Sequence, residues 1–269
     1  MSKVETKQSE FNILPFWSDI KFFLSETADI TLFGIRFFKE CFKLPLEFSE
    51  TINQSFKIGY KSLPLVAITA FIMGLVLTIQ SRPTLIEFGA EAWLPSMVSV
   101  SIVREIGPVI TALICAGKIG SSIGAELGSM KVTEQIDAME VSGTNPFKYL
   151  VVTRIAATTL MVPILVLFAD AVGLYGSYLG VNIKGSVSFS LFYNQVFSKL
   201  VFSDVIPSIT KSFFFGYAIG LIGCFKGYHS DKGTEGVGRS ANSAVVIASL
   251  LVFILDLIAV QITDLFYDL

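Results

Sequence analysis

The first long uncharged stretch of the sequence covers residues 62–81 and reads SLPLVAITAFIMGLVLTIQS. Lys61 precedes it and Arg82 follows it, and no charged side chain lies between them. A helix rises about 1.5 Å per residue, so about twenty apolar residues cross the hydrocarbon core of a bilayer. The stretch therefore predicts a transmembrane helix.

Four further apolar stretches follow at about 94–125, 150–179, 205–225 and 244–266. The first of these four is long and contains Pro108, so we expect it to be kinked or tilted. If it were re-entrant, the chain would have four spans. The pattern favours five and predicts an all-α membrane protein.

The composition agrees with membrane residence. Of the 269 residues, 52% are hydrophobic and 16% charged, against about 25% charged in an ordinary soluble domain. The chain is too apolar for a disordered protein and, with a net charge of −2, not basic enough to bind nucleic acid by bulk electrostatics. Three cysteines exclude a disulfide-stapled secreted scaffold.

The distribution of lysine and arginine predicts the orientation. Residues 1–61 carry eight of them, and the loops after the second and fourth spans carry most of the others. The opposite side holds only Arg82, Lys184 and Lys199. By the positive-inside rule the N-terminus is cytoplasmic and the C-terminus lies outside, as an odd number of spans requires. Residues 1–10 are polar, so no signal peptide is expected.

The segment before the first span is rich in aromatic and basic residues. Phenylalanines alternate with lysine and arginine over residues 11–60, which is typical of helices lying in the membrane interface. We expect Pro45 to separate two such helices. The alternative is an ordinary amphipathic helix packed on the bundle. The chain then divides into an N-terminal segment, 1–60, and a five-span domain, 61–269.

Five ionisable residues lie at or near the middle of the predicted spans: Arg104, Glu105, Asp170, Lys211 and Asp256. Each costs roughly 2.5–3.5 kcal/mol at the bilayer centre, so such residues pair or face a wet cavity. Neighbouring residues point about 100° apart on a helix, so Arg104 and Glu105 should face different partners. The cluster fits passage of an amphipathic molecule, a proton relay, or salt bridges that only fix helix packing.

Other features of the sequence bear on helix packing and exclude several classes of function. Glycines recur every three or four residues in several spans, which predicts close helix packing. Gly117-Lys118 is followed by Ile119, so no phosphate-binding loop is present. His229 has no partner at metal-ligand spacing, and no nucleophile–base constellation is visible, so neither metal binding nor enzymatic activity is expected.

A short helix is predicted in the loop between the second and third spans, at about 133–142. Thr133 is a plausible N-cap, Glu134 and Asp137 lie near the positive end, and Ile136 and Met139 share a face. Such a helix is either a docking element for a partner or a plain connection.

Three motifs lead to a known family: REIGPVITAL (104–113), AELGSMKVTEQIDAM (125–139) and NPFKYLVVTR (145–154). Together with Lys211-Ser-Phe-Phe-Phe-Gly216 and Asp256, they closely resemble the MlaE-type permeases of ABC systems that work with MCE-domain proteins. The resemblance extends over nearly the whole chain from about Phe56. Gln80 is followed by Ser-Arg-Pro where the family often has Gly-Tyr, so the local cavity shape differs.

The resemblance implies a homodimeric permease in the bacterial inner membrane that moves phospholipid between the inner and outer membranes. A separate ATPase subunit would hold ATP and magnesium, and an MCE-domain protein would sit on the periplasmic face. The residues that the resemblance assigns to the ATPase coupling helix are Thr133, Glu134, Gln135, Ile136, Asp137 and Met139. Those assigned to the lipid cavity are Arg104, Glu105, Lys211 and Asp256 for its charges and Leu77, Leu85 and Phe88 for its apolar wall.

The main rival hypothesis is a secondary transporter that uses the buried acids as a proton relay. It predicts transport without an ATPase. Five spans do not divide into two inverted repeats, which disfavours it.

Overall fold

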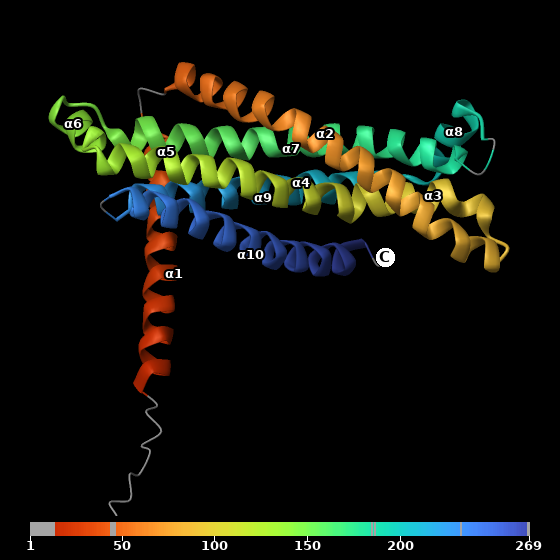
Figure 1. Ribbon diagram of the computed structural model, residues 1–269, viewed down its shortest axis with the longest axis horizontal. Helices are drawn as coiled ribbons and strands as arrows, with labels where there is room; N and C mark the ends of the chain where they lie inside the picture. Colours follow the sequence, from red (N-terminus) through yellow and green to blue (C-terminus); the bar gives the residue numbers. More distant parts are fainter. Residues whose placement is uncertain (1–13, 44–46, 184, 186, 232, 268–269) are drawn as a thin grey trace, which may run out of the picture.

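The computed structural model describes residues 14–43, 47–183, 185, 187–231 and 233–267 (Figure 1). The long helices lie side by side in an elongated bundle, with α6 at one end and α8 at the other. The predicted break at Pro45 lies outside the described residues. Before it, α1 covers Leu14–Cys41, and after it α2 covers Phe48–Glu87.

The second span is assembled from short helical pieces. They are η1 (Glu91–Trp93), α3 (Leu94–Ser101), η2 (Ile102–Ile106), α4 (Gly107–Cys115), η3 (Ala116–Gly120) and α5 (Ser121–Val132). The rest of the chain forms α6 (Gln135–Val141), η4 (Phe147–Val152), α7 (Thr153–Asn182), α8 (Phe189–Lys199), α9 (Phe202–Tyr228) and α10 (Thr234–Tyr267). Three pieces, η2, η3 and η4, are π-helical turns.

Five helical segments are long and apolar enough to cross a membrane: Phe48–Glu87, Glu91–Val132, Phe147–Asn182, Phe202–Tyr228 and Thr234–Phe266. This confirms the prediction of five spans. The second stretch continues as one helical segment through Pro108, so the four-span alternative fails. Its irregularity lies one turn before the proline, in the π-helical turn Ile102–Ile106.

Helix α2 differs from the expectation at its start. It runs from Phe48 to Glu87 without interruption, so the expected boundary between residues 60 and 61 falls inside a helix. Residues 48–60 form the first turns of the same helix that contains the uncharged run 62–81.

Helix α1 crosses the bundle axis and extends away from it (Figure 1). Phe33 and Phe37 are buried, and Phe33 packs edge-on against Phe147 with ring centroids 5.0 Å apart. Arg36 lies 4.2 Å from the centroid of that ring. Leu32 and Phe42 remain exposed. Helix α1 runs across the other long helices and leaves some apolar side chains uncovered, as expected of an interfacial helix. Its place in the membrane stays a prediction.

The glycine stripes mark where helices touch. A Cβ at Gly74 of α2 would overlap the backbone carbonyl of Gly173 in α7, and one at Gly176 would overlap that of Phe71. Gly216 of α9 is likewise close to α7, because a Cβ there would overlap the backbone carbonyl of Thr158. Close approach in lipid depends on such small residues, so these contacts confirm the prediction of tight packing.

Candidate functional site

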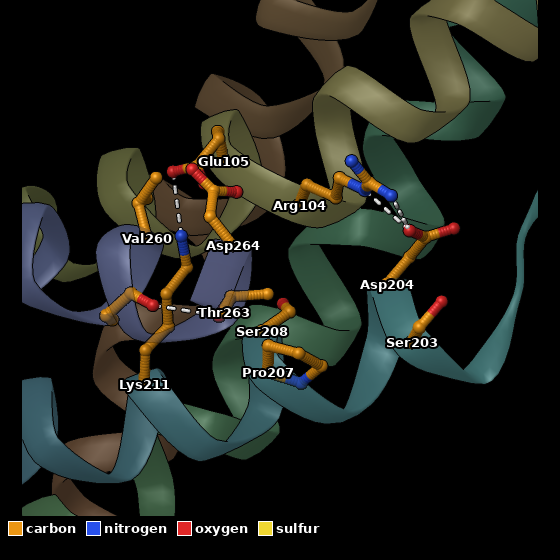
Figure 2. A pocket seen from close by; sticks show the side chains of 11 residues that line it. Arg104, Glu105, Ser203, Asp204, Pro207, Ser208, Lys211, Val260, Thr263 and Asp264 are labelled. Atoms are coloured by element: carbon orange, nitrogen blue, oxygen red, sulfur yellow. Dashed lines mark hydrogen bonds and ion pairs between the residues drawn. The ribbon is translucent and has the colours of Figure 1, made fainter. Parts of the chain in front are cut away.

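A charged cavity of about 170 Å³ lies between η2, α9 and α10 (Figure 2). Its walls contain residues 203–204, 207–208 and 259–260 together with Arg104, Glu105, Lys211, Thr263 and Asp264. Lys211 lies nine residues after Phe202, where α9 begins. At about 1.5 Å per residue this is roughly 14 Å from the helix end. The cavity is therefore in the half of the bundle farthest from α6.

Lys211 is the centre of this cavity. Its Nζ atom donates to Glu105 Oε2 at 2.7 Å and to Asp256 Oδ1 at 2.9 Å. Its side chain is only 5% exposed, whereas that of Glu105 is 45% exposed. An ammonium has three N–H groups, so one has no partner in the described part of the chain. The sequence-predicted residues Glu105, Lys211 and Asp256 thus form one ion-pair network across three spans.

Arg104 belongs to a second ion pair. Its guanidinium lies 2.5 Å from Asp204 Oδ1, and the other oxygen of Asp204 accepts the backbone N–H of Val201 at 3.0 Å. Asp204 is almost fully buried, and Arg104 is 36% exposed. The expectation that Arg104 and Glu105 face different partners is confirmed, because one contacts α9 near its start and the other contacts it further along.

Asp170 is buried but does not join either ion pair. Its side chain comes from α7, is 7% exposed, and has an Oδ1 atom with no hydrogen-bond partner among the described residues. Lys211 is the charged group that acts on it electrostatically. A Cβ at Gly107 would overlap Asp170 Oδ1. The carboxyl therefore fills a space that only a glycine leaves open.

This contact predicts the effect of adding one methyl group to α4. Gly107→Ala should lower the stability of the purified protein by about 1–3 kcal/mol, because overpacking forces side chains or backbone to shift. The measurement is thermal unfolding in detergent. Asp170→Ala in the same chain should recover part of the loss.

A control comes from the same span. A Cβ at Gly117 would meet nothing within 4 Å, so Gly117→Ala should leave stability unchanged or slightly higher. Equal losses for Gly107→Ala and Gly117→Ala would show that the carboxyl contact is irrelevant.

The residues predicted to form an apolar wall are not part of the charged cavity. Leu77 and Leu85 are half-buried against a hydrophobic cluster that includes Leu94, Val98 and Phe192. They therefore point into the bundle rather than toward a surface open to lipid. Phe88 is 79% exposed.

A second cavity lies near the end of α2, on its opposite face. It has a volume of about 380 Å³ and is lined by Ile79, Arg82, Pro83, Ile86, Glu87, Gly180 and Ile183. Ile79, Ile86 and Ile183 are all exposed in part. The exposed apolar surface at this end of α2 is therefore formed by residues on the face opposite Leu77 and Leu85.

The short helix α6 lies at the tip of the bundle and begins later than predicted. Thr133 is the C-cap of α5, and its hydroxyl donates to the Ser129 carbonyl at 2.8 Å. Glu134 adopts a left-handed conformation with φ at 58° and precedes the first residue of α6. The predicted N-cap is therefore wrong: the chain reverses at Glu134, and Gln135 starts the helix.

The structure confirms that Ile136 and Met139 share a face of α6, and it turns that face toward the bundle. Ile136 is 1% exposed and belongs to the main hydrophobic core, and Met139 packs partly against the same core. Asp137 pairs with Lys131 at 2.8 Å and is half-exposed. Val141 is 90% exposed. Ile136 and Met139 thus anchor α6 to the bundle, while Glu134, Gln135, Asp137 and Val141 form its outer surface.

Sequence reasoning missed Asp204, Asp264 and Val141. Asp204 is in the first turn of α9, where an acidic residue is stabilised by the helix dipole, and this signal could have found it. Asp264 lines the charged cavity from α10. Val141 could have been found only by recognising that the face of α6 that contains Ile136 packs into the core. Val141 is then left on the outer surface of the helix.

Five helical segments long and apolar enough to cross a membrane, with a charged cavity between η2, α9 and α10, define a polytopic helical membrane protein. The family model of the permease MlaE matches residues 51–262. The chain belongs to the MlaE permease family, which confirms the predicted fold class and a permease rather than an enzyme.

Similar proteins cover most of the chain. A Rickettsia bellii protein named as a probable ABC transporter permease protein is 40% identical over 237 residues, 88% of this chain and 90% of that protein. A Synechocystis protein of the same description is 38% identical over 204 residues, 76% of this chain and 78% of that protein. The intermembrane phospholipid transport system permease protein MlaE of Haemophilus influenzae is 34% identical over 237 residues, 87% and 90% of the two chains.

Proposed function

We propose that the chain is the permease subunit of an ABC transporter that moves phospholipids between the inner and outer membranes. The observation that carries the proposal is the charged cavity next to an uncovered apolar helix. Arg104 and Glu105 present opposite charges at partly exposed positions. Leu257, Ile258 and Ile262 on α10 are exposed close to the cavity residues Ala259 and Val260.

A charged cavity beside an exposed apolar helix suits a phospholipid, which has a charged headgroup and apolar acyl chains. A guanidinium binds phosphate oxygens through two parallel N–H groups, so Arg104 would receive the phosphate. The Glu105 and Asp264 carboxylates would favour a positively charged headgroup amine. The acyl chains would lie along α10 in the lipid-facing part of the bundle. Glu105 and Asp256 hold Lys211 in place when no lipid is bound.

The proposed assembly follows the family and the shape of the bundle. Two copies would form a homodimer, a separate ATPase subunit that binds ATP and magnesium would dock at α6, and an MCE-domain protein would cover the α8 end. The protein would lie in the bacterial inner membrane with its N-terminus cytoplasmic and its C-terminus periplasmic. The excess of lysine and arginine at the α6 end supports this orientation.

The test is reconstitution of the chain with its ATPase and MCE partner in vesicles that contain a fluorescent phospholipid. We expect ATP-dependent transfer of the lipid to acceptor vesicles. Mass spectrometry of the purified complex should find phospholipid retained. Transfer that continues without the ATPase and follows a proton gradient would favour the secondary transporter and contradict the proposal.

A further inference from the structure

A second polar surface lies far from the charged cavity, in a groove between α2 and the start of α5. Its lining includes Lys57, Lys61, Ser62, Lys118, Ser122 and Glu126. Lys118 belongs to the π-helical turn η3, and its Nζ atom donates to the backbone carbonyl of Lys61. This contact places the Lys118 ammonium beside the backbone of Lys61, so lysines from two different spans line the same groove.

The groove is at the level of the membrane interface. Lys61 lies thirteen residues after the first residue of α2, and Lys118 lies fourteen residues before the last residue of α5. At about 1.5 Å per residue, both are roughly 20 Å from the α6 end of their helices. The uncharged run 62–81 begins directly after Lys61. Phe56 and Tyr60, exposed and stacked 5.4 Å apart, flank it as interfacial aromatics do.

The positive charge of this groove is not compensated. Glu126 is its acidic residue, and that carboxylate already contacts Lys57 at 3.3 Å and the buried Arg154 at 3.1 Å. Lys61 and Lys118 have no carboxylate partner among the residues that the structure describes. A backbone carbonyl orients the Lys118 ammonium but does not neutralise it.

The groove is also open to the bilayer. Lys61 is exposed, Lys118 is partly exposed, and a Cβ placed on Gly117 would meet no atom within 4 Å. We propose that Lys61 and Lys118 bind the phosphate of an anionic phospholipid in the leaflet that surrounds the α6 end. This lipid is distinct from cargo in the charged cavity. Its acyl chains lie along the uncharged part of α2 that follows Lys61, where Leu65 and Ile68 are exposed.

The experiment measures lipid retention by the purified full chain in native mass spectrometry. The protein is stripped of lipid in detergent and then exposed to phosphatidylglycerol or to phosphatidylcholine. Each basic residue near the surface contributes roughly a fivefold gain for an anionic lipid. We therefore expect Lys61→Gln or Lys118→Gln to weaken phosphatidylglycerol binding about fivefold, and the double variant about 25-fold. Phosphatidylcholine binding should change little.

Two further variants test a specific site against general attraction. Lys118→Arg keeps the charge and should keep the binding. Arg239→Gln removes an exposed charge from the first turns of α10 that already has the acidic partners Glu235 and Asp231, and it should have little effect. An equal loss in that control, or unchanged binding in the Lys61 and Lys118 variants, would overturn the proposal. Thermal unfolding checks each fold, and Lys61→Gln keeps the test valid if Lys118→Gln is unstable.

Discussion

Lys211→Met should abolish lipid transport and also destabilise the bundle. The change removes the ammonium and leaves the carboxylates of Glu105 and Asp256 next to each other without a cation. Breaking a buried ion pair by removing one partner costs up to about 3–5 kcal/mol when the remaining charge is buried, and the 45% exposure of Glu105 reduces this cost because water screens its charge. The measurements are thermal unfolding in detergent and ATP-dependent transfer of a fluorescent phospholipid.

A variant in which all three charged residues of the ion-pair network are made neutral separates the role of the network in stability from its role in transport. Lys211→Met combined with Glu105→Gln and Asp256→Asn leaves no unpaired charge, so stability should recover to near that of the unchanged protein. Transport should stay at least roughly tenfold lower, since a charged group that meets the headgroup contributes about 1.5–3 kcal/mol. Full transport by this triple variant would mean that the charges serve helix packing alone.

Arg104→Lys provides a matched comparison outside this network. Lysine keeps the positive charge opposite Asp204 but loses the two parallel N–H groups that suit a phosphate. It should fold normally and transport less. If the triple variant and Arg104→Lys both transported normally, the cavity would not be the headgroup site.

Two lines of reasoning predicted the spans and the charged cavity from the sequence. The cost of charge in lipid predicted that ionisable residues within the spans pair or face a wet cavity, and the family resemblance singled out Glu105, Lys211 and Asp256, which the structure brings together. Glycine spacing predicted close helix contacts, as at Gly176 and Gly216. The spans and the glycine contacts need only helical periodicity, whereas the choice of these three charges came from the resemblance.

Other features depend on the backbone in ways that a periodic pattern does not reveal. The π-helical turn Ile102–Ile106 changes which way its side chains point, and no residue type specifies such a turn. The left-handed Glu134 shifted the start of α6 by two residues. The assignment of Leu77 and Leu85 to the apolar wall of the lipid cavity stays a prediction, because an all-apolar helix gives no sign of which face lines a cavity.

The position of α6 gives the second large expected effect. Val141→Asp should eliminate co-purification of the ATPase and lipid-stimulated ATP hydrolysis while leaving the permease folded. Val141 is 90% exposed at the end of α6, so its replacement disturbs no contact within the chain. If this side chain enters a cleft of the ATPase, the variant buries an unpaired carboxylate, which costs several kcal/mol at an interface. The measurements are pull-down of the ATPase and thermal unfolding of the permease alone.

Comparison with the other variants of this end makes the test specific to docking. Val141→Ile keeps an apolar tip and should keep the ATPase bound, whereas Thr144→Asp adds the same charge in the following loop and should weaken binding far less. Ile136→Asp should instead unfold the tip, because Ile136 is 1% exposed in the core. Normal ATPase binding by Val141→Asp would mean that α6 only connects two spans.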